Sequence, residues 1–268
     1  MIFKIVLALN LISFILSGII FVVISIIFTW FSLVYLIIIF LIVDAFLIYG
    51  TFERRSSIFG KIFWKSQKSN RGISITFDDG PNEPYTSQIL NILDTFNIKA
   101  TFFVIGKKVE LYPDIVSRIV KNGHEIGNHS YNHEVLPLKS PAFIKNQIRN
   151  TSDLIEKVAG VRPELFRAPH GWRNPWVNRI TKEEGCIPVA WTLGVWDTDH
   201  PGVEPIINRT LSKIQSGCVL LLHDGRGTEQ NPDSSQLVEA LPVIIQKCKE
   251  KGYRFLKLSE MIKETGKI

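Results

Sequence analysis

Two adjacent carboxylates, Asp78 and Asp79, follow a run of apolar residues that ends at Phe77. Because neighbouring side chains leave a strand in different directions, one carboxylate could bind a cation while the other moves a proton. Gly80 and Pro81 come next and predict a tight turn that would hold both carboxylates in place. An acidic surface turn has the same composition, so the segment gains meaning only from what the fold brings beside it.

A pair of histidines, His129 and His133, lies four residues apart. On one face of a helical turn, such a pair can bind one metal ion. With a carboxylate it forms a two-histidine, one-carboxylate set, which leaves coordination positions free for water and substrate. Two surface histidines would have the same spacing, but a carboxylate pair at another strand end favours the metal site. His124 precedes its strand, and we interpret it as structural.

Two further segments offer charged groups at strand ends. Arg167 could keep a carboxylate ionised through a bidentate contact, although a surface salt bridge is an equal alternative. His223 ends a very apolar stretch and suits acid–base chemistry near neutral pH. A carboxylate such as Asp197 would orient this histidine and favour its protonated form.

Three tryptophans, Trp172, Trp176 and Trp196, could line a groove and stack on sugar rings. Ordinary packing in the core or at its rim is at least as good an interpretation for any single one of them.

Short apolar runs separated by amphipathic stretches begin after Arg71 and predict strands alternating with helices. This alternation favours a parallel sheet covered by helices. The predicted strands are 72–77, 101–106, 125–129, 165–169, 187–194, 218–223 and 254–258, and the predicted helices include 84–96, 140–160, 202–217 and 234–252. The candidate catalytic groups all fall at or just after the carboxyl ends of strands, where parallel α/β barrels build their active sites.

The N-terminal segment has no charged residue from Ile5 to Val43. A bilayer span needs about 20 apolar residues, so the run predicts two spans joined by a turn near Phe28–Ser32 or near Gly18. One long tilted helix, or an uncleaved signal-anchor, is the alternative.

The net charge of +6 is concentrated in one place, because residues 53–71 carry six basic residues against Glu53 alone. This predicts a juxtamembrane cluster in contact with membrane lipid and leaves no basic stripe for nucleic acid. With two spans, Lys4 and the cluster share the cytoplasmic side, and the three cysteines agree with a reducing compartment. A single span would place the following domain outside. The six basic residues are Arg54, Arg55, Lys61, Lys65, Lys68 and Arg71.

Five ordered segments together resemble the polysaccharide deacetylase family, also called the NodB-homology domain or carbohydrate esterase family 4. The similarity covers about residues 72–262, and five motifs in order are far more specific than any single one. The matching segments are Thr76–Pro81, Gly123–His133, Arg167–Gly171, Trp191–Asp197 and Leu221–His223.

The resemblance implies an α/β fold, a distorted (β/α) barrel of about seven parallel strands. Together with the predicted transmembrane helical hairpin that precedes it, this domain gives a chain of three parts. A membrane anchor would occupy residues 1–52, a basic juxtamembrane linker residues 53–71, and a NodB-like deacetylase domain residues 72–268.

The resemblance also implies one divalent metal ion, usually zinc. Its ligands would be Asp79, His129 and His133, while Asp78 would be the catalytic base, held by Arg167. His223 would be the catalytic acid, tuned by Asp197. The residues expected to contact substrate are Pro169, His170, Trp172, Trp196 and Leu221.

Two departures from the family pattern affect this assignment. His170 stands where many members have an aromatic residue, and this change affects the substrate groove, while its backbone amide could still serve the oxyanion. The fourth segment continues Asp197-Thr198-Asp199 where many members have Asp-Trp. Asp199 therefore stays open as the alternative partner of His223.

We expect a metal-dependent hydrolase that removes an N-acetyl group from an amino sugar in a membrane-associated or lipid-carrier-linked glycan. An outward-facing domain would instead favour peptidoglycan or an exported polysaccharide, and deformylation or O-acetyl ester hydrolysis would use the same chemistry. A carbohydrate-binding membrane protein on the same fold is the non-enzymatic alternative. The presence of every metal ligand and of the acid histidine argues against it, and no obligate protein partner is implied.

Overall fold

The computed structural model describes residues 2–266, with side chains described from residue 12 onward. The chain forms two compact units, one up to Tyr49 and the other from Gly50 onward. Each is described by itself.

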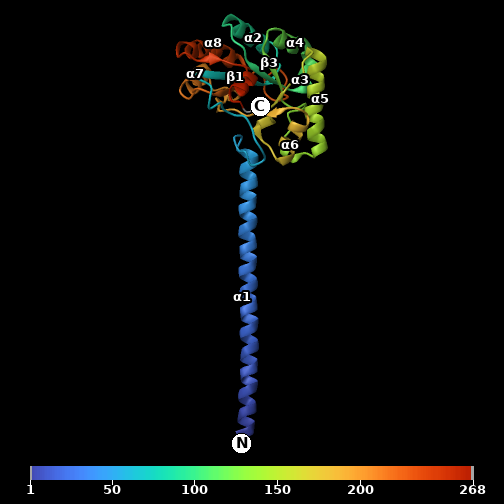
Figure 1. Ribbon diagram of the computed structural model, residues 1–268, viewed down its shortest axis with the longest axis vertical. Coiled ribbons are helices and arrows are strands. Elements are labelled where there is room, and N and C mark those ends of the chain that lie inside the picture. Colours follow the sequence, from blue (N-terminus) through green and yellow to red (C-terminus); the bar gives the residue numbers. More distant parts are fainter. Residues whose placement is uncertain (1, 267–268) are drawn as a thin grey trace. The chain divides into compact units, whose positions relative to one another are not determined.

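The first unit consists of helix α1 (Ile2–Phe52), whose last turn extends into the second unit (Figure 1). The helix is uninterrupted, so the predicted hairpin of two spans is wrong. The segment contains no proline. At the predicted turn, the hydroxyls of Thr29 and Ser32 donate to the carbonyls of Ser25 and Phe28, one turn earlier. These side chains therefore bond back to the helix instead of ending it.

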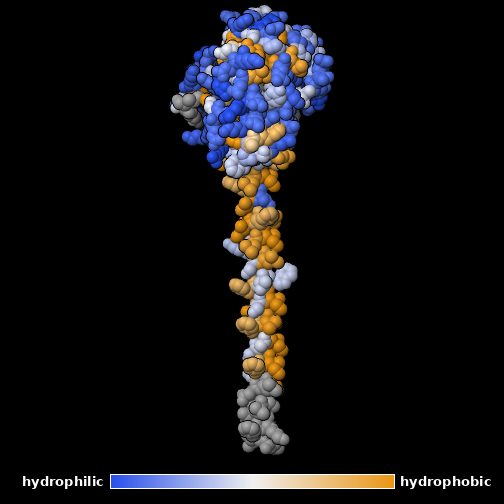
Figure 2. Space-filling view, turned by 90° about the vertical axis from the view of Figure 1, so that its right-hand side faces the viewer, coloured by the Kyte–Doolittle hydropathy of each residue, from blue (hydrophilic) through white to orange (hydrophobic). Residues whose placement is uncertain are grey.

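The apolar part of α1, Ile12–Phe52, is long and apolar enough to cross a membrane, and its mean hydropathy reaches 2.9. Its 41 residues correspond to about 60 Å of helix, against about 30 Å of hydrocarbon in a bilayer. Figure 2 shows this helix predominantly orange, whereas the visible surface of the second unit is mostly blue. Multi-pass anchoring has no support, and the cytoplasmic facing that depended on the hairpin loses its basis.

The second unit alternates strands and helices as the sequence predicts. Its strands are β1 (Gly72–Gly80), β2 (Thr101–Val104), β3 (Glu125–Asn128), β4 (Leu165–Phe166), β5 (Ile187–Pro188), β6 (Leu193–Gly194), β7 (Val219–His223) and β8 (Arg254–Phe255). Its α-helices are α2 (Tyr85–Thr95), α3 (Gly106–Leu111), α4 (Pro113–Lys121), α5 (Pro141–Ala159), α6 (Pro175–Glu183), α7 (Val203–Leu211), α8 (Ser235–Glu250) and α9 (Leu258–Glu264).

The strands follow the order β5-β4-β3-β2-β1-β7-β6, with β8 pairing the start of β1, and every pairing between them is parallel. This half-barrel confirms the predicted fold class. The fifth predicted strand, 187–194, is instead two short strands, β5 and β6, at opposite ends of the order. An apolar run identifies buried residues but does not show where the backbone leaves the sheet.

The basic segment that follows α1 pairs with the backbone at β5 and just before β7. Phe63 donates its N–H to Pro188 and accepts from the N–H of Ala190. Three residues later, Ser66 donates its N–H to the carbonyl of Gly217, just before β7. This segment was predicted as a linker between two parts, and the structure gives it backbone pairing with the barrel.

Helix α5 shows how local sequence sets element boundaries here. The Ser140 hydroxyl accepts the N–H of Phe143 at 3.3 Å, and Pro141 occupies the first helical position. Gly160 ends the helix with φ 71°, a left-handed conformation that suits glycine. Both ends agree with the prediction.

Strand β1 forms the centre of the unit, and all nine of its residues are buried. The Phe77 ring stacks on Phe102 of β2 at 4.9 Å between centroids. Burial of each such side chain contributes about 1.5–3 kcal/mol. This packing fixes the carboxyl end of β1, where the candidate site begins.

Candidate active site

Asp78 and Asp79 both line one cavity, although consecutive strand residues normally point to opposite faces. The register between β1 and β2 shifts between Asp78 and Gly80, so Asp79 is the extra residue of a bulge. Asp79 has φ 70°. The bulge turns the second carboxylate into the same cavity as the first.

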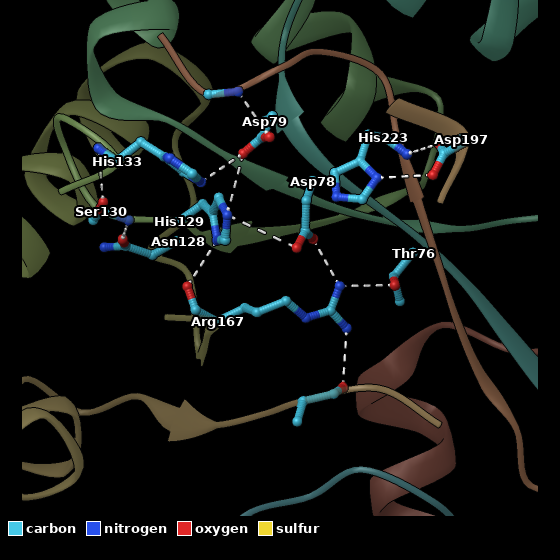
Figure 3. Close-up of polar contacts among 12 residues, drawn as sticks. Thr76, Asp78, Asp79, Asn128, His129, Ser130, His133, Arg167, Asp197 and His223 are labelled. Atoms are coloured by element: carbon cyan, nitrogen blue, oxygen red, sulfur yellow. Dashed lines mark hydrogen bonds and ion pairs between the residues drawn. The ribbon is translucent and has the colours of Figure 1, made fainter. Parts of the chain in front are cut away.

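Asp78 is held by Arg167, which follows β4. The Arg167 Nη1 lies 2.7 Å from Asp78 Oδ1 and 2.8 Å from the Thr76 hydroxyl, and Nη2 donates to the Ala190 carbonyl (Figure 3). The guanidinium also lies 4.2 Å from the Phe103 ring centroid. Burial lowers the pKa of Arg167, and the nearby Asp78 carboxylate opposes that shift. The contact joins one nitrogen to one oxygen and is not the bidentate one expected from the sequence, but it gives the fully buried arginine a counter-charge. Within the described residues, Arg167 Nε has no hydrogen-bond partner.

His129 and His133 meet Asp79, but not on a helical turn as the spacing predicts. Residues 129–133 form a loop after β3, in which Ser130 and His133 have positive φ. Asn128 Oδ1 accepts the N–H of Ser130, and the Ser130 hydroxyl accepts the N–H of His133. These two bonds curl the backbone so that both imidazoles point toward one carboxylate (Figure 3).

The three side chains have the spacing of neighbouring ligands on one cation. Asp79 Oδ1 lies 3.3 Å from His129 Nε2 and 3.1 Å from His133 Nε2. Among the described residues, this buried oxygen has no hydrogen-bond partner. Burial tends to raise the pKa of Asp79, but the two imidazoles hold it well below its usual range.

Hydrogen bonding also fixes which nitrogen of His129 is available. Its Nδ1 lies 2.8 Å from the Arg167 carbonyl, which can only accept, so we assign the proton to Nδ1. Nε2 then presents a lone pair to Asp79, as a metal-binding histidine does. Lone pairs this close repel each other unless a proton or a cation lies between them. The two histidines and the carboxylate therefore fit a divalent metal ion.

His223, at the end of β7, faces the same cavity and is held by Asp197. Its backbone N–H donates to Asp197 Oδ2 at 2.7 Å, and its Nδ1 lies 3.0 Å from Oδ1 (Figure 3). Burial alone would lower the pKa of His223, but Asp197, with Asp79 and Asp78 beyond it, raises the pKa to about 9. Of the two carboxylates that the sequence left open, Asp197 makes these contacts and Asp199 is exposed.

The cavity has a volume of about 570 Å³ and an aromatic wall. Of the predicted substrate residues, His170, Trp172, Trp196 and Leu221 line it, and Pro169 does not. The ring of His170 packs between those of Trp172 and His133, at 5.0 and 4.8 Å.

The third tryptophan considered from the sequence, Trp176, lies on α6 with its ring over Arg179 and does not line the cavity. Trp191 lines it instead. Its place at the start of the fourth matching segment was the only available signal.

A second layer of polar groups supports Asp79 from behind, and sequence reasoning missed it. The buried Lys108 donates to the Asp79 carbonyl at 2.9 Å, and the Thr86 hydroxyl donates to Asp224 Oδ2 at 2.6 Å. A Cβ on Gly80 would lie 2.1 Å from that same Oδ2. Close packing against Asp224 therefore favours glycine at position 80, next to the bulge. The sequence did not indicate the role of Lys108, because its segment has the composition of an exposed helix.

Comparison with known proteins tests the family that this geometry suggests. Residues 65–188 match the family model described as polysaccharide deacetylase. A peptidoglycan-N-acetylglucosamine deacetylase of Bacillus cereus is 39% identical over 209 residues, which is 76% of this chain and 94% of the relative. The chain belongs to the polysaccharide deacetylase family.

This polysaccharide deacetylase is similar both to a further curated enzyme and to a family member described as a pseudoenzyme. A chitooligosaccharide deacetylase of a Bradyrhizobium species is 32% identical, over 71% of this chain and 90% of that one. A crystal structure of a family pseudoenzyme from Bacillus anthracis superposes with a TM-score of 0.70 at 27% identity, covering 76% of this chain and 69% of that one. The polysaccharide deacetylase described here is thus a hydrolase of a family that acts on carbon–nitrogen bonds and depends on metal.

Proposed function

We propose that this domain removes the N-acetyl group from an amino sugar in a glycan of the peptidoglycan or chitooligosaccharide type. The observation that carries this proposal is the division of the two carboxylates. Asp78 pairs with a buried arginine, whereas Asp79 meets two histidines. The names of the relatives support the N-acetylated glycan as the substrate class.

We assign the metal site to Asp79, His129 and His133 and the metal to zinc, which this donor set suits. When bound, the metal would polarise the acetyl carbonyl and lower the pKa of a water molecule beside it.

Asp78 acts as the base in this proposal. Arg167 occupies its Oδ1, which leaves Oδ2, 3.8 Å from His129 Nε2, to accept a proton from the attacking water. The contact with Arg167 also holds this carboxylate in position for the proton transfer.

The backbone N–H of His170 is suited to the oxyanion. His170 has φ 59° and lies in a turn of the loop that follows β4. In this turn, the N–H groups of Gly171 and Trp172 donate to the carbonyls of Ala168 and Pro169. Within the described chain, the His170 N–H has no such partner. An unpaired donor at the cavity wall would stabilise the charge that develops on the carbonyl oxygen.

His223 acts as the acid that protonates the departing amine. Its Nδ1–H points to Asp197, so the opposite ring nitrogen, Nε2, carries the proton that can be transferred. A pKa of about 9 keeps both nitrogens protonated at neutral pH.

The pH dependence of turnover tests the His223–Asp197 pair. Protonated His223 is the active form, so turnover should fall as pH rises through its pKa, at about 9 or lower with a cation bound. In Asp197→Asn we expect this basic limb to move toward the ordinary value of about 6.5. Asparagine offers one oxygen to two donors, so the histidine also loses orientation. The measurement is kcat against pH with a soluble glycan.

Asp199→Asn provides the matched control, because Asp199 lies two residues away and is exposed. A basic limb at the same pH in wild type and Asp197→Asn would contradict the acid assignment.

Product analysis tests the proposed reaction itself. The full chain, purified in detergent with zinc, would be offered chitooligosaccharides, peptidoglycan and a lipid-linked N-acetylglucosamine. We expect acetate and a free amine from at least one of them. Formate from an N-formyl analogue alone, or acetate from O-acetyl esters alone, would replace the proposal with deformylation or ester hydrolysis. No product from any substrate would leave the non-enzymatic alternative standing.

A further inference from the structure

An arginine from the segment directly after α1 lines the catalytic cavity. Arg54 shares the cavity wall with Asp78, Trp191 and His223. Its guanidinium lies 5.1 Å from the Trp191 ring centroid, and its Nε donates to the Trp191 carbonyl at 3.4 Å. The family model begins only at residue 65, so this cation comes from outside the matched region.

The backbone around Arg54 is held firmly by a second arginine. Arg173 is 2% exposed, and its Nη2 donates to the carbonyls of Glu53, Arg54 and Ser56, at 3.4, 3.2 and 3.0 Å. Its backbone N–H donates to the carbonyl of Thr51. Arg54 is therefore positioned in advance at the cavity wall.

Close packing reinforces this position. A Cβ on Gly171 would lie 2.7 Å from the Trp191 ring and 3.3 Å from Arg54 Cβ. Phe52 also packs edge-on against Trp172, with ring centroids 5.0 Å apart. The turn that carries the proposed oxyanion donor thus contacts the Arg54 segment directly.

Arg54 forms no ion pair among the described residues, although the charge of Glu53 acts on it from a distance. Its neighbour Glu53 lies 3.4 Å from Arg55 instead. Apart from the Trp191 carbonyl, no acceptor within the described chain occupies the guanidinium, which leaves both terminal nitrogens available for a ligand. A half-buried cation loses part of its hydration, and a bound anion would offset that loss.

We propose that Arg54 determines specificity by binding an anionic group on the glycan, next to the sugar that is deacetylated. This proposal rests on the proposed function and names its substrate class as negatively charged glycans. A planar guanidinium with two free nitrogens matches a carboxylate or a phosphate through paired hydrogen bonds. Two sources offer that chemistry: the lactyl carboxylate of a muramic acid residue, and the pyrophosphate of a lipid carrier.

The experiment compares Arg54→Gln with Arg55→Gln in the full chain. Arg55 is the matched control, since its exposed side chain lies over Trp64 and pairs with Glu53 outside the cavity. Three substrates would be used: a neutral chitooligosaccharide, a muramic-acid-containing glycan, and N-acetylglucosaminyl pyrophosphate on a short prenyl chain. For Arg54→Gln we expect KM to rise roughly tenfold or more on an anionic substrate. Its kcat, and its KM for the neutral oligosaccharide, should change little.

The substrate on which KM rises identifies the source of the anion, and Arg54→Lys should recover part of the loss. An equal KM increase on all three substrates would show that Arg54 only supports Trp191 and would overturn the proposal, as would no change on any of them. Calorimetric binding of the same three compounds to Asp78→Asn protein, with and without Arg54→Gln, gives a readout that needs no turnover. If wild type releases no acetate, the proposed function fails, while this binding comparison still decides the role of Arg54.

Discussion

Replacing Asp78 with asparagine is expected to lower kcat by about 10²- to 10⁴-fold, the usual contribution of a general base. The amide has nearly the same shape and can still accept the hydrogen bond from Arg167, but it cannot take a proton from water. Because the metal ligands are untouched, the variant should bind as much metal as wild type. The measurements are acetate release and metal content of the purified full chain.

Folding needs its own control in this variant, because it leaves a buried arginine without its counter-charge. Breaking a buried pair in this way costs roughly 3–5 kcal/mol of folding free energy. Thermal unfolding should therefore be compared, and kcat measured well below the unfolding temperature. A folded variant with wild-type acetate release would remove Asp78 from the role of base.

Substitution of the adjacent carboxylate, Asp79→Asn, should have a different signature. Asp79 Oδ1 is the oxygen that meets both histidines, and a neutral amide is a far poorer ligand. We expect bound metal and acetate release to be lost together, with a fall in metal affinity beyond the 10- to 100-fold typical of losing a mere supporting contact. Treatment of wild type with a chelator should likewise reduce turnover to background, and added zinc should restore it.

The two neighbouring variants control for each other. Asp78→Asn should retain metal without turnover, and Asp79→Asn should lose both. Full activity after complete removal of metal would contradict the metal site, and tight metal binding by Asp79→Asn would contradict its ligand set. Restoration by another divalent ion but not by zinc would change only the identity of the metal.

The sequence predicts most of this site because its groups lie at the ends of buried strands. The run of apolar residues predicts a strand such as β1, and parallel strands place their carboxyl ends at one edge of the sheet. The sequence alone therefore predicts that Asp78, Arg167 and His223 lie in one site. The choice of Asp197 over Asp199 needed coordinates, because both lie within one short 3₁₀ turn.

Local backbone geometry was harder to predict than burial. The spacing of His129 and His133 suggested a helix, but Asn128 and Ser130 bond to nearby N–H groups and stabilise a loop instead. In α1 the error was the opposite, because the length of the apolar run implied a turn that no residue specifies. Hydrophobicity alone does not encode where a chain reverses.

The role of the basic segment was also hidden from the sequence. Its six cations were interpreted as a cluster facing lipid, which is the usual meaning of such a composition. Arg54 instead lines the cavity, and Lys65 pairs with Cys218 in a backbone bridge. No periodicity marks these residues, since each contact depends on a partner more than a hundred positions away.

The hydrogen bonds of Arg173 determine where the domain of this enzyme can be joined to or exchanged with the domain of a relative. Family similarity begins at residue 65, so a recombination or cloning boundary would naturally be placed there. Such a boundary would remove the carbonyls of Glu53, Arg54 and Ser56 and leave the buried Arg173 Nη2 without these three acceptors. The unit that can be inherited or transplanted intact therefore starts before Thr51, inside the last turn of α1.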